Sequence, residues 1–351
     1  MTERPVIALD AMGGDGGPAA VVAAAEVARE RYPKLLFRLY GDEAAIRLAL
    51  ATAPRVRAEA VVIHTDTQVL GTDKPSQAVR KGRGTSMGLA IEAVKAGDAH
   101  AVVSAGNTGA LMSMAYLALR TMEGIDRPAL AARLPTLKND SVVLDLGANT
   151  ECDAENLVQF AVMGAAFART VLGLERPRVA LLNIGEEELK GTDELKEAAM
   201  LLRAVDLPMA FMGFVEGDKI GQGNTDVIVT DGFSGNIALK SVEGTGKLVT
   251  GLLAEAFKTS WLTRLGYLLS RGALRALRAH LDPNAHNGAV MLGLNGLVVK
   301  SHGGATVRGL ANAIGVAHDL IVADVQRKIS DDLANFRAHR PAHVDLESSA
   351  K

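Results

Sequence analysis

The sequence has one cysteine and no long hydrophobic run. Because Cys152 has no possible partner within the 351 residues, an internal disulfide and a cysteine-based zinc site are both excluded, and a reducing cytosol is the expected compartment. No stretch of about 18 uncharged apolar residues could cross a membrane as a helix. The opening stretch MTERPVIALD also lacks the apolar core of a secretory signal peptide. We therefore expect a cytoplasmic protein.

An excess of charge of one sign is also missing. The formal net charge is −2, so the chain as a whole gives no reason to expect a nucleic-acid partner, and any basic function must be local. The eight histidines are scattered and no H-E-x-x-H motif occurs, which predicts no metal site. Glycine, by contrast, is abundant. Its 36 residues predict many tight turns at which the backbone approaches a ligand or another element.

One pattern recurs along the chain: a short β-branched run, a glycine-rich turn and a helical stretch. The predicted strands cover 6–10, 101–104, 142–145, 179–183, 226–230 and 297–300. The helices that follow are predicted over 19–30, up to 119, 154–172, 194–204, 237–257 and 307–314. This alternation predicts a three-layer α/β/α fold with a mainly parallel sheet. We expect one α/β domain over 1–338, with room for two lobes around a cleft, and a disordered tail over 339–351.

The six turns carry Asp, Ser, Asn or His beside glycine. In parallel sheets, ligands bind at the carboxyl ends of the strands, where such turns lie. An alternative for any one turn is that these residues only form turns and helix caps. For the six together, we expect convergence on one cleft at one edge of the sheet.

Generic catalytic motifs are not met. The segment GGDGGP lacks the spacing of a dinucleotide-binding loop, and the Gly-Lys pair at 246–247 is not part of a phosphate-binding P-loop. The segment GTSMG at 84–88 fits the nucleophile-elbow pattern of hydrolases, but charged residues rather than a strand precede it. Thr85 or Ser86 is better explained as the N-cap of a helix over 87–95.

That helix start lies in a basic segment. Lys74, Arg80 and Arg83 flank glycines at a helix N-terminus, where free N–H groups and the positive end of the helix dipole favour an anion. The segment is interpreted as a phosphate or phosphopantetheine site. The alternative is a solvated basic loop.

The segment over 256–281 is basic and amphipathic. It has no acidic residue and contains the only tryptophan, Trp261, in phase with Leu265 and Leu268. Gly266 and Gly272 interrupt it, so a helical hairpin is predicted. Such a segment is typical of an element that lies on an anionic membrane surface. An ordinary packing helix or a dimer contact explains the residues equally well.

Taken together in order, seven segments resemble the PlsX family of bacterial phosphate acyltransferases, from about residue 6 to about residue 333. They are ALDAMGGDGGP, DKPSQAVRKGRGTSM, SAGNTGALM, DLGANTECDAENLVQFAVMG, LLNIGEEELKGT, DGFSGNIALKSVEG and VVKSHGGA. Gly16 and Gly304 stand where relatives often carry larger residues, which puts only the substrate preference in doubt.

The resemblance implies a fold similar to phosphotransacetylase and to the isocitrate and isopropylmalate dehydrogenases. It implies transfer of a long-chain fatty acyl group from acyl carrier protein to inorganic phosphate, for phospholipid synthesis. It also implies a homodimer without metal or nucleotide cofactor, peripheral membrane attachment through 256–281, and a membrane glycerol-phosphate acyltransferase as a downstream partner.

The reaction predicts two sets of residues within the quoted segments, and the basic segment over 256–281 supplies a third. Phosphate is itself a nucleophile, so the protein has to bind the dianion, align it and stabilise an oxyanion. The catalytic candidates are Lys190, Asp231, Asn236, Lys240 and His302. The candidates for binding phosphate or substrate are Gly13, Gly14, Asp15, Lys74, Ser76, Arg80, Arg83, Ser86, Ser104, Gly106, Asn107, Thr108, Gly109, Gly147, Asn149, Ser234 and Gly235. The candidates for membrane contact are Trp261, Leu262, Leu265, Leu268, Arg271, Arg275 and Leu277.

Some residues are assigned no chemistry. Asp10 and Asp145 are expected to brace loops, Cys152 is expected to be a buried structural thiol, and either lysine candidate has the alternative of a solvated helix lysine. The acyl chain is expected to lie among the helices after Gly109.

Three other functions would need different features. An acyl-CoA:phosphate acyltransferase of the phosphotransacetylase kind would not need the basic segment with Trp261. A metal-dependent dehydrogenase would need clustered aspartates and a nucleotide loop. A non-catalytic membrane-binding adaptor would not need six polar glycine turns.

Overall fold

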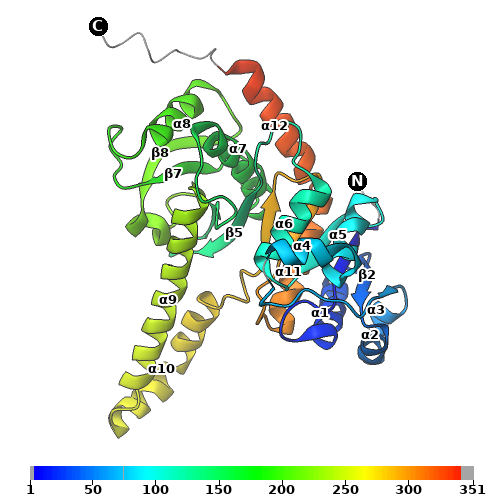
Figure 1. Cartoon of the computed structure of the whole chain (residues 1–351). Helices are drawn as coiled ribbons and strands as arrows, with labels where there is room; N and C mark the ends of the chain where they lie inside the picture. Colours follow the sequence, from blue (N-terminus) through cyan, green and yellow to red (C-terminus); the bar gives the residue numbers. More distant parts are fainter. Residues whose placement is uncertain (1–3, 74, 341–351) are drawn as a thin grey trace.

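The computed structural model describes residues 4–73 and 75–340 (Figure 1). Within these ranges, eleven strands form one sheet in the order β3-β2-β1-β4-β11-β10-β5-β6-β9-β7-β8. The predicted tail over 339–351 lies almost wholly outside the described residues, as does Lys74. The strands are β1 (Val6–Asp10), β2 (Leu36–Gly41), β3 (Val61–His64), β4 (Ala101–Ser104), β5 (Ala129–Pro135), β6 (Asp140–Leu144), β7 (Arg178–Asn183), β8 (Ala210–Glu216), β9 (Val227–Val229), β10 (Ala289–Leu292) and β11 (Leu297–Lys300).

Helices follow most of the strands, as the alternating pattern predicts. They are α1 (Gly17–Arg31), α2 (Glu43–Leu50), α3 (Pro54–Arg57), α4 (Pro75–Lys81), α5 (Ser86–Lys95), α6 (Thr108–Leu119), α7 (Ala154–Val171), α8 (Asp193–Ala204), α9 (Gly232–Ala256), α10 (Trp261–His280), α11 (Val307–Val322) and α12 (Val325–His339), with 3-10 turns η1 (Gly82–Gly84) and η2 (Gly217–Gln222). The basic segment after Gly71 therefore contains a helix of its own, α4, that the sequence analysis does not predict.

Two cores cover the two faces of the sheet. On one face, apolar side chains of α1, α7, α8, α11 and α12 pack against alternate strand residues such as Ile7 and Leu9. On the other face, α4, α5, α6, η2 and the first turns of α9 pack against the residues between them, such as Ala8. This arrangement confirms the predicted α/β/α class, because helices lie on both faces of a mostly parallel sheet.

The sheet reverses direction in its middle. Strands β3, β2, β1, β4 and β11 are parallel to one another, and so are β6, β9, β7 and β8. Between these two groups, β10 is antiparallel to β11 and to β5, and β5 is antiparallel to β6. The two parallel groups therefore run in opposite directions.

This reversal corrects one prediction. The polar turns after β1, β4 and β11 lie at one edge of the sheet, whereas those after β6, β7 and β9 lie at the opposite edge. The expectation that all six turns share one edge is wrong. The residues accordingly fall into two separate polar clusters.

A two-helix arm extends from the body (Figure 1). It is formed by the outer part of α9 and by α10, which runs without a break through Gly266 and Gly272. The chain turns between them, where Ser260 caps α10 and the ring of Phe257 contacts that of Tyr267 at 5.5 Å between centroids. The hairpin thus consists of α9 and α10 and does not lie wholly within 256–281. None of the described helices is long and apolar enough to span a bilayer.

A close approach of two glycines fixes the start of α5. A Cβ added at Gly88 would lie 1.8 Å from the carbonyl oxygen of Gly82, whereas one added at Gly84 would meet no atom within 4 Å. We expect Gly88→Ala to lower the free energy of unfolding by about 1–3 kcal/mol, measured by chemical denaturation, because the backbone has to shift. Gly84→Ala is the matched control and should change it by less than about 1 kcal/mol. Equal effects of the two changes would contradict this packing.

Candidate active site

The first polar cluster lies at the carboxyl ends of β1, β4 and β11. Asp10, Ser104 and Lys300 end these three adjacent strands, and Ser104 pairs directly with Lys300 in the parallel register. The strand residues two positions earlier, Ala8, Val102 and Val298, all belong to the core under α5 and α6. Because side chains alternate along a strand, Asp10, Ser104 and Lys300 lie on that same face.

A buried carboxylate organises this cluster. Ser86 Oγ and Ser104 Oγ each donate to a carboxylate oxygen of Asp10 at 2.6 Å, and Ser104 Oγ also accepts from Gly106 N at 3.0 Å. Burial raises the pKa of Asp10, and the two serine hydrogen bonds oppose that rise. Asp10 thus ties β1 to β4 and to the start of α5, as expected of a bracing residue. The hydroxyls of Ser86 and Ser104 already have a partner, and their role in substrate binding stays a prediction.

Two helix N-termini open into this cluster. Thr85 caps α5 by accepting from Gly88 N at 3.1 Å, which is the cap that the sequence predicts. Asn107 caps α6 by accepting from Ala110 N at 3.0 Å, and its side-chain amide donates to the carbonyl of Gly71 at 2.8 Å. That second bond brings the basic segment against the start of α6.

The first two backbone N–H groups of α6 do not donate to a capping side chain. Among the residues that the structure describes, none accepts a hydrogen bond from Thr108 N or Gly109 N. Thr108 is exposed and Gly109 is half-buried, so both amides are near solvent. Free amides at the positive end of a helix dipole are the physical basis of anion binding.

The turns after β1 and β11 close the same edge. Asp15 N donates to the carbonyl of Gly303 at 3.0 Å, and a Cβ on Gly14, whose φ is +82°, would lie 2.9 Å from that oxygen. His302 is exposed, and its Nδ1 accepts from Gly304 N at 3.2 Å. Gly13 lies against Asp10 and Gly106 N, where an added Cβ would clash at 2.5 and 2.8 Å. The structure therefore brings the predicted residues of these three turns together.

Lys300 is the residue of this cluster that the sequence analysis missed. It is 8% exposed, and its ammonium group donates to the carbonyl of Ser301. Burial lowers the pKa of Lys300 to about 8, while the nearby Asp10 opposes that shift. A lysine that closes an apolar central strand is the signal that could have found it, because such a side chain ends beside the ligand-binding turns.

The second polar cluster lies at the opposite edge, around Asp145. The carboxylate of Asp145 accepts from the backbone amides of Leu130, Gly147 and Ala148 at 3.0–3.1 Å. It also accepts from the backbone and side-chain amides of Asn149 at 2.7 and 2.8 Å. A carboxylate of the chain thus occupies a nest of amides that would otherwise suit an anion.

The start of α9 packs on that nest. Asp231 caps α9 by accepting from Ser234 N at 2.8 Å, and a Cβ on Gly235 would lie 1.9 Å from the carbonyl oxygen of Asp145. Asn236 is exposed at the end of this cluster, near Gly147. The predicted residues of the turns after β6 and β9 are therefore together, but the amides of Gly147 and Asn149 are already bonded to Asp145.

Comparisons with known proteins decide the family. Residues 6–328 match the family model described as "Fatty acid synthesis protein". The chain is 58% identical over 338 residues to a phosphate acyltransferase of Rhodospirillum centenum, covering 96% of this chain and 95% of that one. It is 53% identical over 352 residues to a phosphate acyltransferase of Nitrobacter hamburgensis, covering 100% and 98% of the two chains. The chain belongs to the phosphate acyltransferase family.

A solved structure shows the same fold outside the family. A phosphotransacetylase from Streptococcus pyogenes superposes with a TM-score of 0.60 at 17% sequence identity, covering 92% of this chain and 95% of that one. At this identity the likeness bears on the fold alone. The predicted similarity to phosphotransacetylase is confirmed.

The two lysines predicted to be catalytic, Lys190 and Lys240, lie away from the buried side chains of both polar clusters. Lys190 is exposed in the turn after β7, where its carbonyl accepts from the side-chain amide of Asn183 at 3.1 Å. Lys240 is exposed on α9 and pairs with Glu243 at 2.8 Å. Their catalytic roles stay predictions, and the structure gives Lys240 the surface partner that the alternative explanation requires.

In the basic segment, Ser76, Arg80 and Arg83 are exposed. Asn107 connects the neighbouring residue Gly71 to α6, so this segment borders the first cluster. Lys74 lies outside the described residues. The anion that these side chains face therefore stays a prediction.

Cys152 lies beside the second cluster. Burial, with Asp145 and Asp231 nearby, raises the pKa of the Cys152 thiol to about 12. The thiol is therefore protonated at neutral pH and is not a nucleophile, which agrees with a structural role. Within 4–73 and 75–340, no group of three or more His, Cys, Asp or Glu side chains is placed to hold a metal ion.

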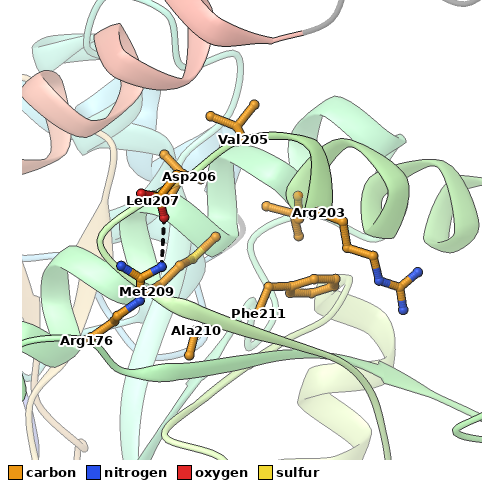
Figure 2. Close-up of a pocket in the computed structure, with 9 residues that line it drawn as sticks. Arg176, Arg203, Val205, Asp206, Leu207, Met209, Ala210 and Phe211 are labelled. Carbon is orange, nitrogen blue, oxygen red and sulfur yellow. Dashed lines mark hydrogen bonds and ion pairs between the residues drawn. The ribbon is translucent and has the colours of Figure 1, made fainter.

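A pocket away from both clusters lies in the second half of the sheet. It has a volume of about 410 Å³ and lies between the end of α8 and the start of β8, with Arg176 paired to Asp206 at its rim (Figure 2). Arg203 lies over the ring of Phe211 at 5.8 Å in the same pocket. None of the predicted site residues lines it.

The buried lysine predicts a pH dependence of stability. Because its pKa is about 8 in the folded protein and 10.5 as a free group, the unfolded chain binds more protons between these values, and stability rises with pH. We expect Lys300→Met to remove a rise of about 3 kcal/mol in the free energy of unfolding over this window, measured by denaturant titration at several pH values. Lys34→Met, at an exposed lysine, is the control and should keep the slope. An unchanged slope in Lys300→Met would contradict the burial of this ammonium group.

Proposed function

We propose that this phosphate acyltransferase takes a long-chain acyl group from acyl carrier protein and transfers it to inorganic phosphate bound at the first polar cluster. The observation that carries the location is the pair of unbonded amides at the start of α6, next to a strand whose last residue pairs with Lys300. In the second cluster, the turn amides of Gly147 and Asn149 already donate to Asp145.

The charges of the first cluster suit a phosphate dianion. The N-terminus of α6 supplies N–H donors and a partial positive charge, and Lys300 is mainly protonated at neutral pH because its pKa is about 8. Asp10 carries the opposing charge, but its oxygens accept hydrogen bonds from two serines. An ammonium group with little water around it also stabilises developing negative charge more strongly than an exposed one.

The reaction needs no nucleophile from the protein. A phosphate oxygen attacks the thioester carbonyl, so that a C–O bond forms and the tetrahedral oxyanion develops. The C–S bond then breaks, and the carrier thiolate takes a proton. Exposed His302, held by the amide of Gly304, is the group at this edge that we assign to the proton transfer. Asp231, Asn236, Lys190 and Lys240 lie at the opposite edge, so with phosphate at the first cluster we assign them no contact with the reacting atoms.

A direct assay tests the donor and the acceptor. The protein is incubated with long-chain acyl carrier protein and phosphate, and acyl phosphate is trapped with hydroxylamine. We expect phosphate-dependent hydroxamate, and a much lower yield when acyl-CoA replaces the acyl carrier protein. No phosphate-dependent hydroxamate from either donor would contradict the activity, whereas an equal or higher yield from acyl-CoA would support the phosphotransacetylase-like alternative.

We also propose peripheral attachment of the arm to an anionic membrane surface. Trp261 and Leu269 on α10 are 72% and 81% exposed, and Leu262, Leu265 and Leu268 are exposed as well. The helix has basic but no acidic side chains, among them Arg271 and Arg275, and Leu277 continues its apolar series. Two contributions bind such a helix to a membrane. Its apolar side chains enter the membrane–water interface, and its cationic side chains lie near anionic lipid headgroups. Acyl phosphate formed there would lie close to a membrane glycerol-phosphate acyltransferase.

The same arm supports a homodimer as the assembly. On α9, the side chains of Leu248, Val249 and Leu252 are 61%, 42% and 62% exposed. A second copy that packs against this part of α9 would bury them, while α10 would stay free to contact lipid. The proposal thus gives the dimer contact to the outer part of α9 and the lipid contact to α10.

Liposome binding tests the membrane contact. We expect Trp261→Glu together with Leu265→Glu to abolish co-sedimentation with anionic liposomes, because two charges would enter the interfacial layer. Acyl phosphate formation from a soluble donor should be retained. Leu48→Glu, at an exposed leucine of α2, is the control and should bind liposomes like the unmodified protein. Undiminished binding of the double variant would place the anchor elsewhere.

A further inference from the structure

The loop that returns from the arm to the body lies against the turn after β11. This loop connects α10 to β10 over residues 281–288, and the turn follows β11 over residues 301–306. Two asparagines of the loop hold the turn: Asn287 bonds to its start and Asn284 bonds to its end. The loop therefore reaches the first polar cluster from outside the residues that the sequence predicts for the site.

Asn287 is buried, and both polar atoms of its side chain are used. The residue is 8% exposed. Its Oδ1 accepts from His302 N at 3.0 Å, and its Nδ2 donates to Ser301 Oγ at 2.8 Å. Because a backbone N–H can only donate, the His302 N–H fixes which way round the amide of Asn287 lies. Loss of this side chain would leave that N–H without its partner.

The peptide between Ser301 and His302 is held at both ends. Its N–H donates to Asn287, and its carbonyl oxygen, which belongs to Ser301, accepts from the ammonium group of Lys300. Ser301 is fully buried, and its own N–H donates to the carbonyl of Ser104 at 2.9 Å, which ties the turn to β4. Because a peptide unit is planar, these bonds fix the plane from which the side chain of His302 projects.

Bonds within the turn hold the ring of His302. Its Nδ1 accepts from Gly304 N at 3.2 Å, and its carbonyl oxygen accepts from Ala305 N at 3.1 Å. These two bonds shape the turn but do not tie it to the rest of the protein. The far end of the turn is tied by Asn284, whose Oδ1 accepts from Thr306 N at 2.9 Å and from Thr306 Oγ1 at 3.0 Å.

We propose that Asn287 is a positioning residue that orients His302 for the proton transfer of the acyl transfer reaction. The inference rests on the proposed function and adds the residue that sets the geometry of its proton-transfer group. The proton that the phosphate dianion gives up as the C–O bond forms is the one that the carrier sulfur gains as the C–S bond breaks, so His302 only relays it. Asn287 touches neither phosphate nor thioester and acts through the turn.

The expected effect follows from the precision that such a transfer needs. A displacement of about 1 Å of a reacting group can lower a rate about a hundredfold. A side chain that fixes the peptide of His302 therefore has a measurable effect on kcat, although it makes no contact with the substrate.

The kinetics of Asn287→Ala test the proposal. We expect kcat for acyl phosphate formation to fall at least about tenfold, because His302 is no longer held, while KM for phosphate stays within about twofold, because the amides of α6 bind phosphate. Asn295→Ala is the matched control, since its side-chain amide also donates a hydrogen bond, to the carbonyl of Thr121 at 2.7 Å, at the other end of β10 and β11. It should change neither value by more than about twofold.

A comparison of double variants separates positioning from a merely structural role. In His302→Ala, the residue through which Asn287 acts is gone, so the addition of Asn287→Ala should lower kcat by less than about twofold further. Three results would overturn the proposal: an undiminished effect of Asn287→Ala in the His302→Ala background, an unchanged kcat in Asn287→Ala alone, or an equal fall of kcat in Asn295→Ala.

A milder change covers the case in which Asn287→Ala does not fold, as thermal unfolding of each variant will show. Asn287→Asp keeps an oxygen for His302 N but loses the amide that donates to Ser301 Oγ. We expect its kcat to fall about threefold, because one of the two bonds to the turn is lost, and the fall to disappear in His302→Ala. No fall, or an equal fall with and without the imidazole of His302, would overturn the proposal here as well.

The same measurements keep the possible failures apart. If the unmodified protein makes no acyl phosphate from either donor, the proposed function fails and this inference with it. If His302→Ala is as fast as the unmodified protein, the proton-transfer role of His302 fails together with the positioning role, while acyl transfer itself stands. If His302→Ala is slow but Asn287→Ala is not, only the positioning role of Asn287 fails.

Discussion

The reversal of strand direction at β10 and β5 is the constraint on which the rest of the molecule depends. Two parallel groups of strands that run in opposite directions join in one sheet through β10 and β5, which lie antiparallel between them. The reversal sends the turns of one group to one edge and those of the other to the opposite edge. The separation of the two polar clusters has this cause.

Both polar clusters are organised around an aspartate, but the two aspartates bind different donors. In each of them a strand-end aspartate accepts hydrogen bonds from the neighbouring turns and joins the strands. Asp145 takes up the backbone amides around it, which makes that edge a braced corner. Asp10 instead accepts from two serine hydroxyls and from the amide of Met12 at 3.3 Å. The two aspartates thus join their strands through different donors.

Local features could be predicted from the sequence. The helix over 154–172, the strand over 297–300 and the Thr85 cap all depend on neighbouring residues, and the structure confirms them as α7, β11 and the start of α5. Features that depend on distant pairing could not. The strand β10 follows an irregular stretch and pairs with β5, which is more than a hundred residues away.

The same distinction between local features and distant pairing applies to the candidate site. The turns around Asp10 and His302 were found from their glycines and polar residues, because such patterns are local. Lys300 was missed because nothing near it in the sequence shows that it is buried next to an aspartate from the first strand. The assignment of the turns to two edges needed the sheet order, which no single segment contains.

Helix α9 connects two parts of the molecule. Its first turns pack on the second polar cluster and on the sheet, and its outer turns form part of the arm, within one continuous helix of 25 residues that is about 37 Å long. Its first turn is fixed, because Asp231 caps it and Gly235 packs closely against the carbonyl oxygen of Asp145. Because the helix is continuous, a tilt of the arm would be transmitted along its axis to the turn around Asp145.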